Sequence, residues 1–332
     1  MPTARCPESP ANTLKVPGYM TTNAFVQFRP MDKVTLALGG SVAAYAKPAA
    51  LDPYYGERPV SGTAFAKLGS RVTVVEAAEH VLPLYDAELV RPVLARLEEL
   101  GVTVLTGAKP GGLDKKGLKI DHGGKSKTVP ADKVLVTVGR RPKTEGYGLE
   151  ELDLDRSGRF IRIDDRCRTS MRGVYAIGDV TGEPMLAHRA MAQGEMVAEI
   201  LAGEKRAWDK VCVPAVCFTD PEIVTAGLSP EEAKAAGVEV KLGSFPFQAN
   251  GRAMTLEQET GFVRAVARAD NHLLLGLQAV GAGISELSAT FALALEMGAR
   301  LEDVAATIHA HPTQSEGLQE AAFKALGHAI HI

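Results

Sequence analysis

Several features that would place a protein in a special class are scarce in this sequence of 332 residues. Aromatic residues make up only 5% of it, tryptophan occurs once, and the four cysteines are Cys6, Cys167, Cys212 and Cys217. Four scattered cysteines do not form the framework of a disulfide-stapled secreted domain, so they indicate a reduced, cytoplasmic setting. The formal net charge of −3 gives no reason to expect nucleic acid or an anionic membrane as a partner.

Long apolar runs are also missing. A membrane-spanning helix needs about 20 apolar residues, and the longest candidate, Leu273–Ile284, is interrupted by Gln278 and three glycines. The first residues lack the apolar core of a signal peptide. The hydrophobic share of 45% and the charged share of 23% are those of an ordinary globular protein, and the length predicts two or three soluble domains.

The first 61 residues differ in pattern from the rest. They contain eight of the 19 prolines, and neither a helical nor a strand period persists in them. One fragment, Val34–Ala44, could form a strand, a glycine turn and a helix, but its glycines do not complete a G-x-G-x-x-G loop. We therefore leave residues 1–61 irregular and unassigned.

From Gly62 the pattern becomes regular, and strands alternate with helices. Asp86 predicts the N-cap of a long helix that Gly101 ends and Pro92 bends. The predicted elements are helix Gly62–Leu68, strand Arg71–Glu76, helix Asp86–Leu100, strand Val102–Leu105, and, after a Gly/Lys-rich turn region, strand Lys133–Val138 ending at Gly139. This alternation predicts an α/β, Rossmann-like parallel sheet with helical cover.

The second half predicts a different architecture. Short strands at Phe160–Ile163 and Val174–Ile177 precede a helix over Leu186–Leu201. The strands expected after residue 209 are Ala215–Phe218, Val238–Phe245, Gly261–Ala267 and Leu273–Val280, and the helices are Ser285–Met297, Leu301–Thr307 and Ser315–Leu326. An antiparallel sheet backed by helices is an α+β domain.

Three segments of the sequence contain residues suited to ligand binding or to acid–base catalysis. The apolar strand before Gly178 delivers a glycine that lets backbone approach a ligand, and Asp179 then offers a carboxylate to a hydroxyl group. The helix that follows Met185-Leu186-Ala187-His188 points its N–H groups and dipole at the same place. Near the C-terminus, the stretch His309–Glu316 pairs a histidine with a glutamate, which is the composition of an acid–base couple.

Glu76 ends the predicted strand Arg71–Glu76, at the position where a dinucleotide fold has an acid that binds the adenine ribose. A surface glutamate at a strand end is the alternative interpretation of that residue. For Asp179 the alternative interpretation is a capping aspartate, and for His188 it is an exposed helix residue.

These motifs together resemble the pyridine nucleotide–disulfide oxidoreductases. Residues 173–194 look like the second flavin-contacting segment of that family, and His309–Glu316 resembles its C-terminal active-site signature. The stretch Ala215–Glu222 and its surroundings are most similar to the dihydrolipoyl dehydrogenases, the flavoproteins of 2-oxo acid dehydrogenase complexes. The resemblance covers residues 62–332. It implies a partial NAD-binding domain over 62–141, a returning segment of the FAD-binding domain over 142–208, and an interface domain over 209–332.

The resemblance also implies roles. His311 would take a thiol proton from dihydrolipoamide, and Glu316 would orient it. Gly178, Asp179, Met185, Leu186, Ala187 and His188 would contact FAD, while Glu76 and Gly139 would contact NAD. A homodimer is implied, because in this family the histidine completes the site of the other subunit. Lipoyl domains of a 2-oxo acid dehydrogenase complex would be further partners.

Other family members fit less well. Mercuric reductases end in a cysteine pair, and none follows Glu316 here. Glutathione reductases prefer NADP and carry arginine where Glu76 stands.

Parts of the family pattern are missing from the chain. Neither a G-x-G-x-x-G loop nor a C-x-x-x-x-C redox pair occurs in residues 1–61, and Tyr55–Ser61, with a proline and bulky side chains, occupies the place of the NAD glycine loop. Cys212 and Cys217 have the spacing of a redox pair. However, five residues of extended strand would separate their α-carbons by about 16 Å, whereas a disulfide tolerates less than about 7 Å.

The cluster His309, His311, His328 and His331 lacks a third ligand set on one rigid face, so we expect no metal site. Two interpretations remain: a truncated, impaired dihydrolipoyl dehydrogenase-like oxidoreductase, or a non-catalytic remnant that serves as a dimerisation module.

Overall fold

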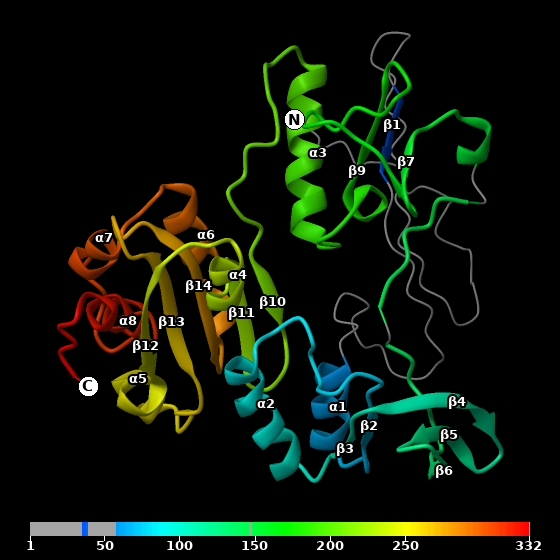
Figure 1. The fold of residues 1–332 in the computed structure, drawn as a ribbon, viewed down its shortest axis with the longest axis horizontal. Coiled ribbons are helices and arrows are strands. Elements are labelled where there is room, and N and C mark those ends of the chain that lie inside the picture. Colours follow the sequence, from blue (N-terminus) through cyan, green and yellow to red (C-terminus); the bar gives the residue numbers. More distant parts are fainter. Residues whose placement is uncertain (1–34, 39–57, 138, 146–147, 332) are drawn as a thin grey trace, which may run out of the picture. The chain divides into compact units, whose positions relative to one another are not determined.

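The computed structural model describes residues 35–38, 58–137, 139–145 and 148–331. Contacts between α-carbons divide these residues into two compact units. The smaller unit contains residues 140–207 together with strand β1 (Thr35–Leu38), and the larger contains residues 58–139 and 208–331 (Figure 1).

The smaller unit is built around one parallel strand pair. Strand β1 lies beside β9 (Val174–Ile177), so part of the fragment whose glycine pattern is weak does form a strand; Gly39–Ala44 lies outside the described residues. The remaining elements are η2 (Leu149–Glu151), β7 (Arg156–Ser157), β8 (Phe160–Ile161), η3 (Gly178–Thr181) and α3 (Ala187–Leu201). Residues of η2, β8, β9 and η3 form a small core, which contains Leu149, Ile161, Ala176 and Val180. The predictions of a strand at 174–177 and of a helix up to Leu201 are confirmed.

The larger unit begins with the order helix, strand, helix, strand. These elements are α1 (Arg58–Lys67), β2 (Thr73–Val75), α2 (Ala87–Glu99) and β3 (Thr103–Leu105), with β2 and β3 parallel. Asp86 caps α2 as predicted, because its Oδ1 accepts hydrogen bonds from the N–H groups of Glu88 and Leu89. Helix α1 starts at Arg58, four residues before the point where the sequence pattern becomes regular.

Two predictions for residues 108–138 are wrong. The turn region is a three-stranded antiparallel sheet of β4 (Ala108–Asp114), β5 (Gly117–His122) and β6 (Lys125–Pro130). Residues 133–137 form no strand, and Leu135 and Val136 are exposed. A strand needs a neighbour to satisfy its backbone, and the described residues offer none to this segment.

The rest of the larger unit is an antiparallel sheet with the order β10-β11-β14-β13-β12. Its strands are β10 (Ala215–Cys217), β11 (Glu222–Gly227), β12 (Val240–Pro246), β13 (Phe262–Arg268) and β14 (Leu274–Gly281). The helical segments are α4 (Pro230–Ala235), η4 (Phe247–Ala249), α5 (Gly251–Thr255), η5 (Ile284–Leu287), α6 (Ser288–Glu296), α7 (Leu301–Ala306) and α8 (Glu316–Leu326). The four predicted strands and three predicted helices of this region are confirmed, whereas β11, α4 and α5 were not predicted.

Both faces of this sheet are covered. On one face, Val224, Leu277 and Ala279 share a core with Phe291 of α6 and Leu318 of α8. On the other face, Cys217, Ile223 and Val280 share a core with residues of β2 and α2 that include Val74, Val93 and Leu97. The first four elements of the larger unit therefore have no separate core of their own but pack on the antiparallel sheet.

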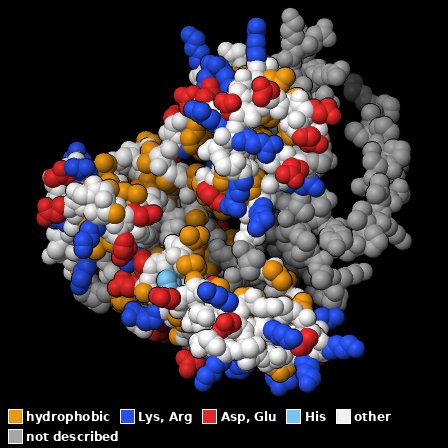
Figure 2. Space-filling view, turned by 45° about the vertical axis from the view of Figure 1, so that its right-hand side comes forward, with side chains coloured by type: hydrophobic (Ala, Val, Ile, Leu, Met, Phe, Trp, Pro, Cys, Tyr) orange, Lys and Arg blue, Asp and Glu red, His pale blue; other side chains and the backbone are white. Residues whose placement is uncertain are grey.

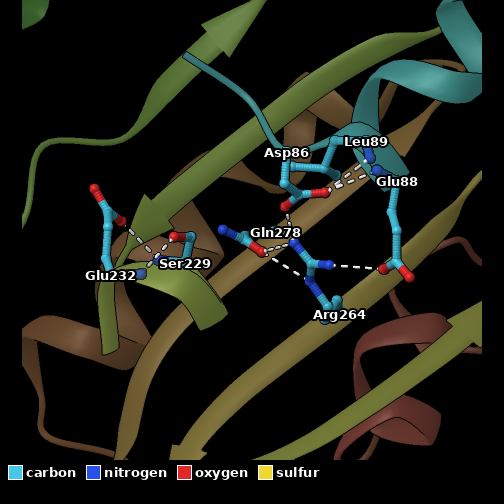
Figure 3. Close-up of polar contacts among 7 residues, drawn as sticks. All are labelled: Asp86, Glu88, Leu89, Ser229, Glu232, Arg264 and Gln278. Atoms are coloured by element: carbon cyan, nitrogen blue, oxygen red, sulfur yellow. Dashed lines mark hydrogen bonds and ion pairs between the residues drawn. The ribbon is translucent and has the colours of Figure 1, made fainter. Parts of the chain in front are cut away.

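Ion pairs reinforce this packing. Arg264 of β13 is almost fully buried, and its guanidinium donates to the carboxylates of Asp86 and Glu88 at the start of α2 and to Gln278 Oε1 (Figure 3). Asp220, just before β11, pairs with Lys67 of α1 at 2.7 Å and with Arg96 of α2 at 2.9 Å.

No helix in the described part of the chain is long and apolar enough to cross a membrane. Basic and acidic side chains are interspersed on the face shown in Figure 2, in keeping with the small net charge.

Candidate active site and cofactor-binding segments

His311 and Glu316 lie side by side at the start of α8. The His311 Nδ1 atom is 2.9 Å from Glu316 Oε1, and the second carboxylate oxygen, Oε2, accepts a hydrogen bond of 2.7 Å from the Thr313 N–H group. A carboxylate oxygen can only accept, so Nδ1 carries a proton and Nε2 is left as the proton acceptor of the ring. The imidazole is 77% exposed while the glutamate is 24% exposed, so the couple presents its basic nitrogen outward.

The turn that carries His311 is anchored from distant parts of the chain. Asn250 is 2% exposed, and its Nδ2 atom donates to the Thr313 carbonyl at 3.0 Å while its Oδ1 atom accepts from Ala253 N–H at the start of α5. Gln314 Nε2 donates to the Ala282 carbonyl at 2.7 Å. Sequence reasoning missed Asn250; its one available signal was an N-cap residue directly before a glycine, Gly251, whose Cβ position would lie 3.8 Å from the His311 ring.

The charge of Glu316 is favoured by its partners. Burial alone would raise its pKa, but the hydrogen bonds from the Thr313 N–H group and from His311 hold the pKa of this carboxyl below its ordinary value. An ionised carboxylate at Nδ1 stabilises the imidazolium that forms when Nε2 takes a proton. The couple can therefore act as a general base, and afterwards as a general acid.

His309 is a different kind of histidine. Its Nε2 atom is buried and has no hydrogen-bond partner among the described residues, and burial lowers the pKa of its ring. A neutral, inward-facing imidazole packs in the fold and is not poised to exchange protons with a substrate.

Gly178 and Asp179 follow strand β9 as one short 3-10 turn. Gly178 has a φ of +73°, which favours glycine, and its N–H group donates to Gln193 Oε1 of α3 at 2.7 Å. Asp179 is 7% exposed, and its carboxylate accepts no hydrogen bond from any residue within the described ranges. A buried carboxylate with unused acceptors suits a ligand hydroxyl group.

Met185–His188 forms the entry to α3. Leu186 is the N-cap residue, and no side chain caps the first turn. The backbone around it is held by two arginines: Arg140 donates to the Met185 carbonyl at 2.5 Å, and Arg189 donates to the Gly182 carbonyl at 2.6 Å. Burial lowers the pKa of Arg189, and the charge of Asp179 opposes that shift, which places the carboxylate near this helix start. The segment thus offers a helix N-terminus beside a buried acid, the arrangement expected for an electron-rich ring and its polyol chain.

Glu76 and Gly139, the two predicted NAD contacts, have fewer features of a cofactor-binding site. Glu76 follows β2 and is 8% exposed, and its Oε1 atom accepts a hydrogen bond of 2.9 Å from the Ala78 N–H group. Gly139 has a φ of +114°. Residues 58–61 form the first turn of α1 and contain no glycine, so the start of this helix provides no glycine loop to hold a dinucleotide pyrophosphate.

The described thiols are not those of a redox centre. Cys167, Cys212 and Cys217 form no disulfide, Cys217 is buried in β10, and burial raises the pKa of Cys212. Burial also raises the pKa of Cys167 to about 11. Thiols with raised pKa values are poor nucleophiles at neutral pH. Among the residues that the structure describes, no group of three His, Cys, Asp or Glu side chains could hold a metal ion.

Comparison with known proteins identifies the class. Residues 60–194 match the pyridine nucleotide-disulphide oxidoreductase profile, and residues 213–322 match the dimerisation domain of the same family. The chain belongs to the pyridine nucleotide–disulphide oxidoreductases, and its fold is a partial Rossmann-like region followed by the antiparallel dimerisation domain of that family.

Two of its relatives are dihydrolipoyl dehydrogenases. The chain is 61% identical over 272 residues to a dihydrolipoyl dehydrogenase of Pseudomonas aeruginosa, covering 82% of this chain and 59% of that protein. It is 49% identical to a dihydrolipoyl dehydrogenase 2 of Haloarcula marismortui, covering 81% of this chain and 58% of that one. The chain therefore spans less than two thirds of the length of these relatives.

Two solved structures have a similar fold. LpdA from Mycobacterium tuberculosis matches with a TM-score of 0.75 and 28% identity, over 87% of this chain and 69% of that one. The HOCl-induced flavoprotein disulfide reductase RclA from Escherichia coli matches with a TM-score of 0.72 and 25% identity, over 79% and 61%.

Proposed function

We propose that this chain supplies the acid–base part of a dihydrolipoyl dehydrogenase active site, in which a dithiol is oxidised and NAD is reduced. The observation that carries the proposal is the His311–Glu316 couple, with Nδ1 held by the carboxylate and Nε2 exposed on the dimerisation domain. The relatives at 61% and 49% identity, both dihydrolipoyl dehydrogenases, support the substrate class.

The role of each residue follows from its contacts. His311 Nε2 takes a proton from a substrate thiol, and Glu316 stabilises the resulting imidazolium through Nδ1. Asn250 and Gln314 fix the turn on which this exchange takes place. An exposed ring needs a second surface to exclude water around it, which favours a site completed by another subunit.

The segments proposed to bind FAD and NAD do not fit their cofactors equally well. For FAD, the unused carboxylate of Asp179, the glycine at 178 and the helix N-terminus at Leu186, whose side chain does not cap α3, suit a ribityl hydroxyl and a flavin ring; Met185, Ala187 and His188 remain proposed contacts beside them. When bound, the flavin would accept the two electrons of the thiol pair. For NAD, Glu76 and Gly139 remain the proposed contacts, but residues 58–61 are helical and glycine-free and do not fit a pyrophosphate cradle. We therefore expect this chain by itself to bind flavin weakly and to lack turnover.

We infer a homodimer as the basic assembly, with lipoyl domains as further partners when a complete site is present. The dimerisation domain supports this, as do three large apolar side chains of that domain that the structure leaves exposed: Leu293, Met297 and Ile308. A non-catalytic dimerisation module is the second candidate function, favoured by the lack of any redox cysteine pair in residues 1–61.

A mixed dimer separates these two functions. The chain would be co-expressed with the full-length Pseudomonas aeruginosa relative carrying glutamine at the position that aligns with His311. We expect dihydrolipoamide-dependent NAD reduction to return in the purified mixed dimer, because this chain provides the missing base. The His311→Gln variant should abolish the recovery, while the exposed control His328→Gln should leave it unchanged.

Recovery that persists in His311→Gln would refute the acid–base role. Mixed dimers that form without any recovery would establish the module alone. Stoichiometric flavin absorbance with turnover by the isolated chain would contradict the expectation that this chain is impaired.

A further inference from the structure

Three side chains outside the candidate active site form a relay on the dimerisation domain. Lys241 of β12 lies with its Nζ atom 2.9 Å from His272 Nε2, and His272 Nδ1 is hydrogen-bonded to Glu302 Oε1 of α7. The carboxylate can only accept, so Nδ1 holds the ring proton and Nε2 faces the lysine as an acceptor. The hydrogen bond from His272 is also the main reason why the pKa of Glu302 is below its ordinary value.

The position of His272 is fixed by the backbone. This residue ends the turn between β13 and β14 with a φ of +62°, a region that few non-glycine residues adopt. Its N–H group donates to the Arg268 carbonyl at 3.1 Å, and its carbonyl accepts from Leu301 N–H at 3.0 Å, where α7 begins. Residues with this backbone conformation concentrate at functional sites. In this conformation the His272 imidazole lies between an amine and a carboxylate.

The relay has the layout of an activated nucleophile. A nucleophile within hydrogen-bond reach of a base, with the base oriented by a third group, is the arrangement that activates Ser and Cys nucleophiles, and here a lysine amine occupies the nucleophile's place. His272 is 25% exposed and Lys241 is partly buried, so both can be reached from solvent. Lys241 faces the same side of the sheet as Gly243, which α8 covers, and so stands at the margin of that covered face.

We propose that Lys241 is a self-acylating lysine that accepts small acyl groups from thioesters. The ammonium of Lys241 first releases one proton to solvent, which leaves a neutral amine. The Nζ lone pair then attacks the thioester carbonyl carbon, and as the C–N bond forms, His272 Nε2 takes the second proton from the attacking nitrogen while Glu302 stabilises the imidazolium. The C–S bond breaks, and the leaving thiolate takes the proton held by His272, so the products are acyl-lysine, a thiol and the proton released to solvent. This proposal is independent of the proposed function.

Chemical acylation tests it directly. The purified chain would be incubated at near-neutral pH with S-acetyl-N-acetylcysteamine, a small thioester, and acetylation followed at each lysine by quantitative mass spectrometry. Lys234 on α4 is the internal control, because it is exposed and contacts no histidine among the described residues. We expect Lys241 to react about tenfold or more faster than Lys234, although exposure alone predicts the opposite order.

Two variants identify the base. His272→Asn keeps a residue that tolerates the left-handed turn but removes the imidazole, and it should lower the Lys241 rate to that of Lys234. Glu302→Gln should give an intermediate rate. The rate at Lys234 in each variant and its circular dichroism spectrum report whether the fold is intact. An equal or slower rate at Lys241 in the unmodified chain, or an unchanged rate in a folded His272→Asn variant, would overturn the proposal.

Discussion

The two parts of the larger unit teach different lessons about strands. Between residues 215 and 281, five strands join one sheet, and β11, β13 and β14 each have neighbours on both sides. Between residues 58 and 137, β2 and β3 pair only with each other within the described residues, and the predicted strand Lys133–Val138 is not formed there. A hydrophobic period favours a strand, but the presence of partner strands decides whether it forms.

The cores differ in the same way. The antiparallel sheet shares its inner face with α6, α7 and α8, all of which follow it in the chain. Helix α2 instead packs against residues of the sheet, Ile223 and Val280, more than a hundred positions away in sequence. Within the described residues, β2, β3 and α2 are thus stabilised by packing on the dimerisation domain, and the parallel pairing of this region is limited to β2 and β3.

The largest effect we predict comes from separating these two parts. Arg264→Met keeps much of the buried volume but leaves the carboxylate of Asp86, which is 14% exposed, without its cation. Breaking a buried ion pair from one side costs about 3–5 kcal/mol, so we expect a loss of that order in the free energy of unfolding, measured with urea.

Arg268 on the same strand is the matched control. It pairs with Asp270 at 2.8 Å on the surface, so Arg268→Ala should leave the urea midpoint unchanged. Equal stability of the Arg264 and Arg268 variants would mean that the two parts are not held together by this network.

A smaller effect is expected from added bulk within each part. A Cβ atom at Gly243 would lie 2.0 Å from the Ala321 carbonyl oxygen and 2.6 Å from Ala325 N, so Gly243→Ala must push α8 away from β12. Overpacking of this kind costs about 1–3 kcal/mol. At Gly111 in β4 the nearest atom would be 3.7 Å away, an ordinary contact. We expect thermal unfolding to show a clear destabilisation for Gly243→Ala and almost none for Gly111→Ala; the reverse order would contradict the packing described for α8.

Many elements of the larger unit could be predicted from local signals. Asp86 marks the start of α2 and alternating apolar residues mark β13 and β14, because these elements obtain their burial in a way that each segment reveals alone. The β4–β6 sheet was missed because glycine and lysine dominate its sequence. The Gly123-Gly124 pair, with φ values of +63° and +73°, is the signal of a two-residue hairpin turn that would have found it.

The contacts of the candidate site likewise include some that local sequence predicts and others that it does not. His311 and Glu316 are five positions apart, so a local motif is sufficient to predict that they meet. Asn250 reaches the same turn from 63 positions away, and the Lys241–His272–Glu302 relay joins three separate elements. Contacts of this kind depend on the register of the sheet and on where α7 and α8 pack, neither of which a single sequence states.

The smallest effect we predict is the pH dependence of the His311–Glu316 couple. The pKa of Glu316 in the folded chain lies below its ordinary value of 4.5. A group whose pKa is depressed by folding stabilises the fold above its ordinary pKa and loses that contribution as the pH falls through the folded value. Glu316→Gln should therefore lower the free energy of unfolding by about 1 kcal/mol at neutral pH, and the difference from the unmodified chain should shrink below pH 4.5. Glu259→Gln provides the control, because this exposed side chain makes no hydrogen bond with the described residues. Urea unfolding across this pH range gives the measurement, and a difference that stays constant into acid would show that the Glu316 charge does not hold the His311 turn in place.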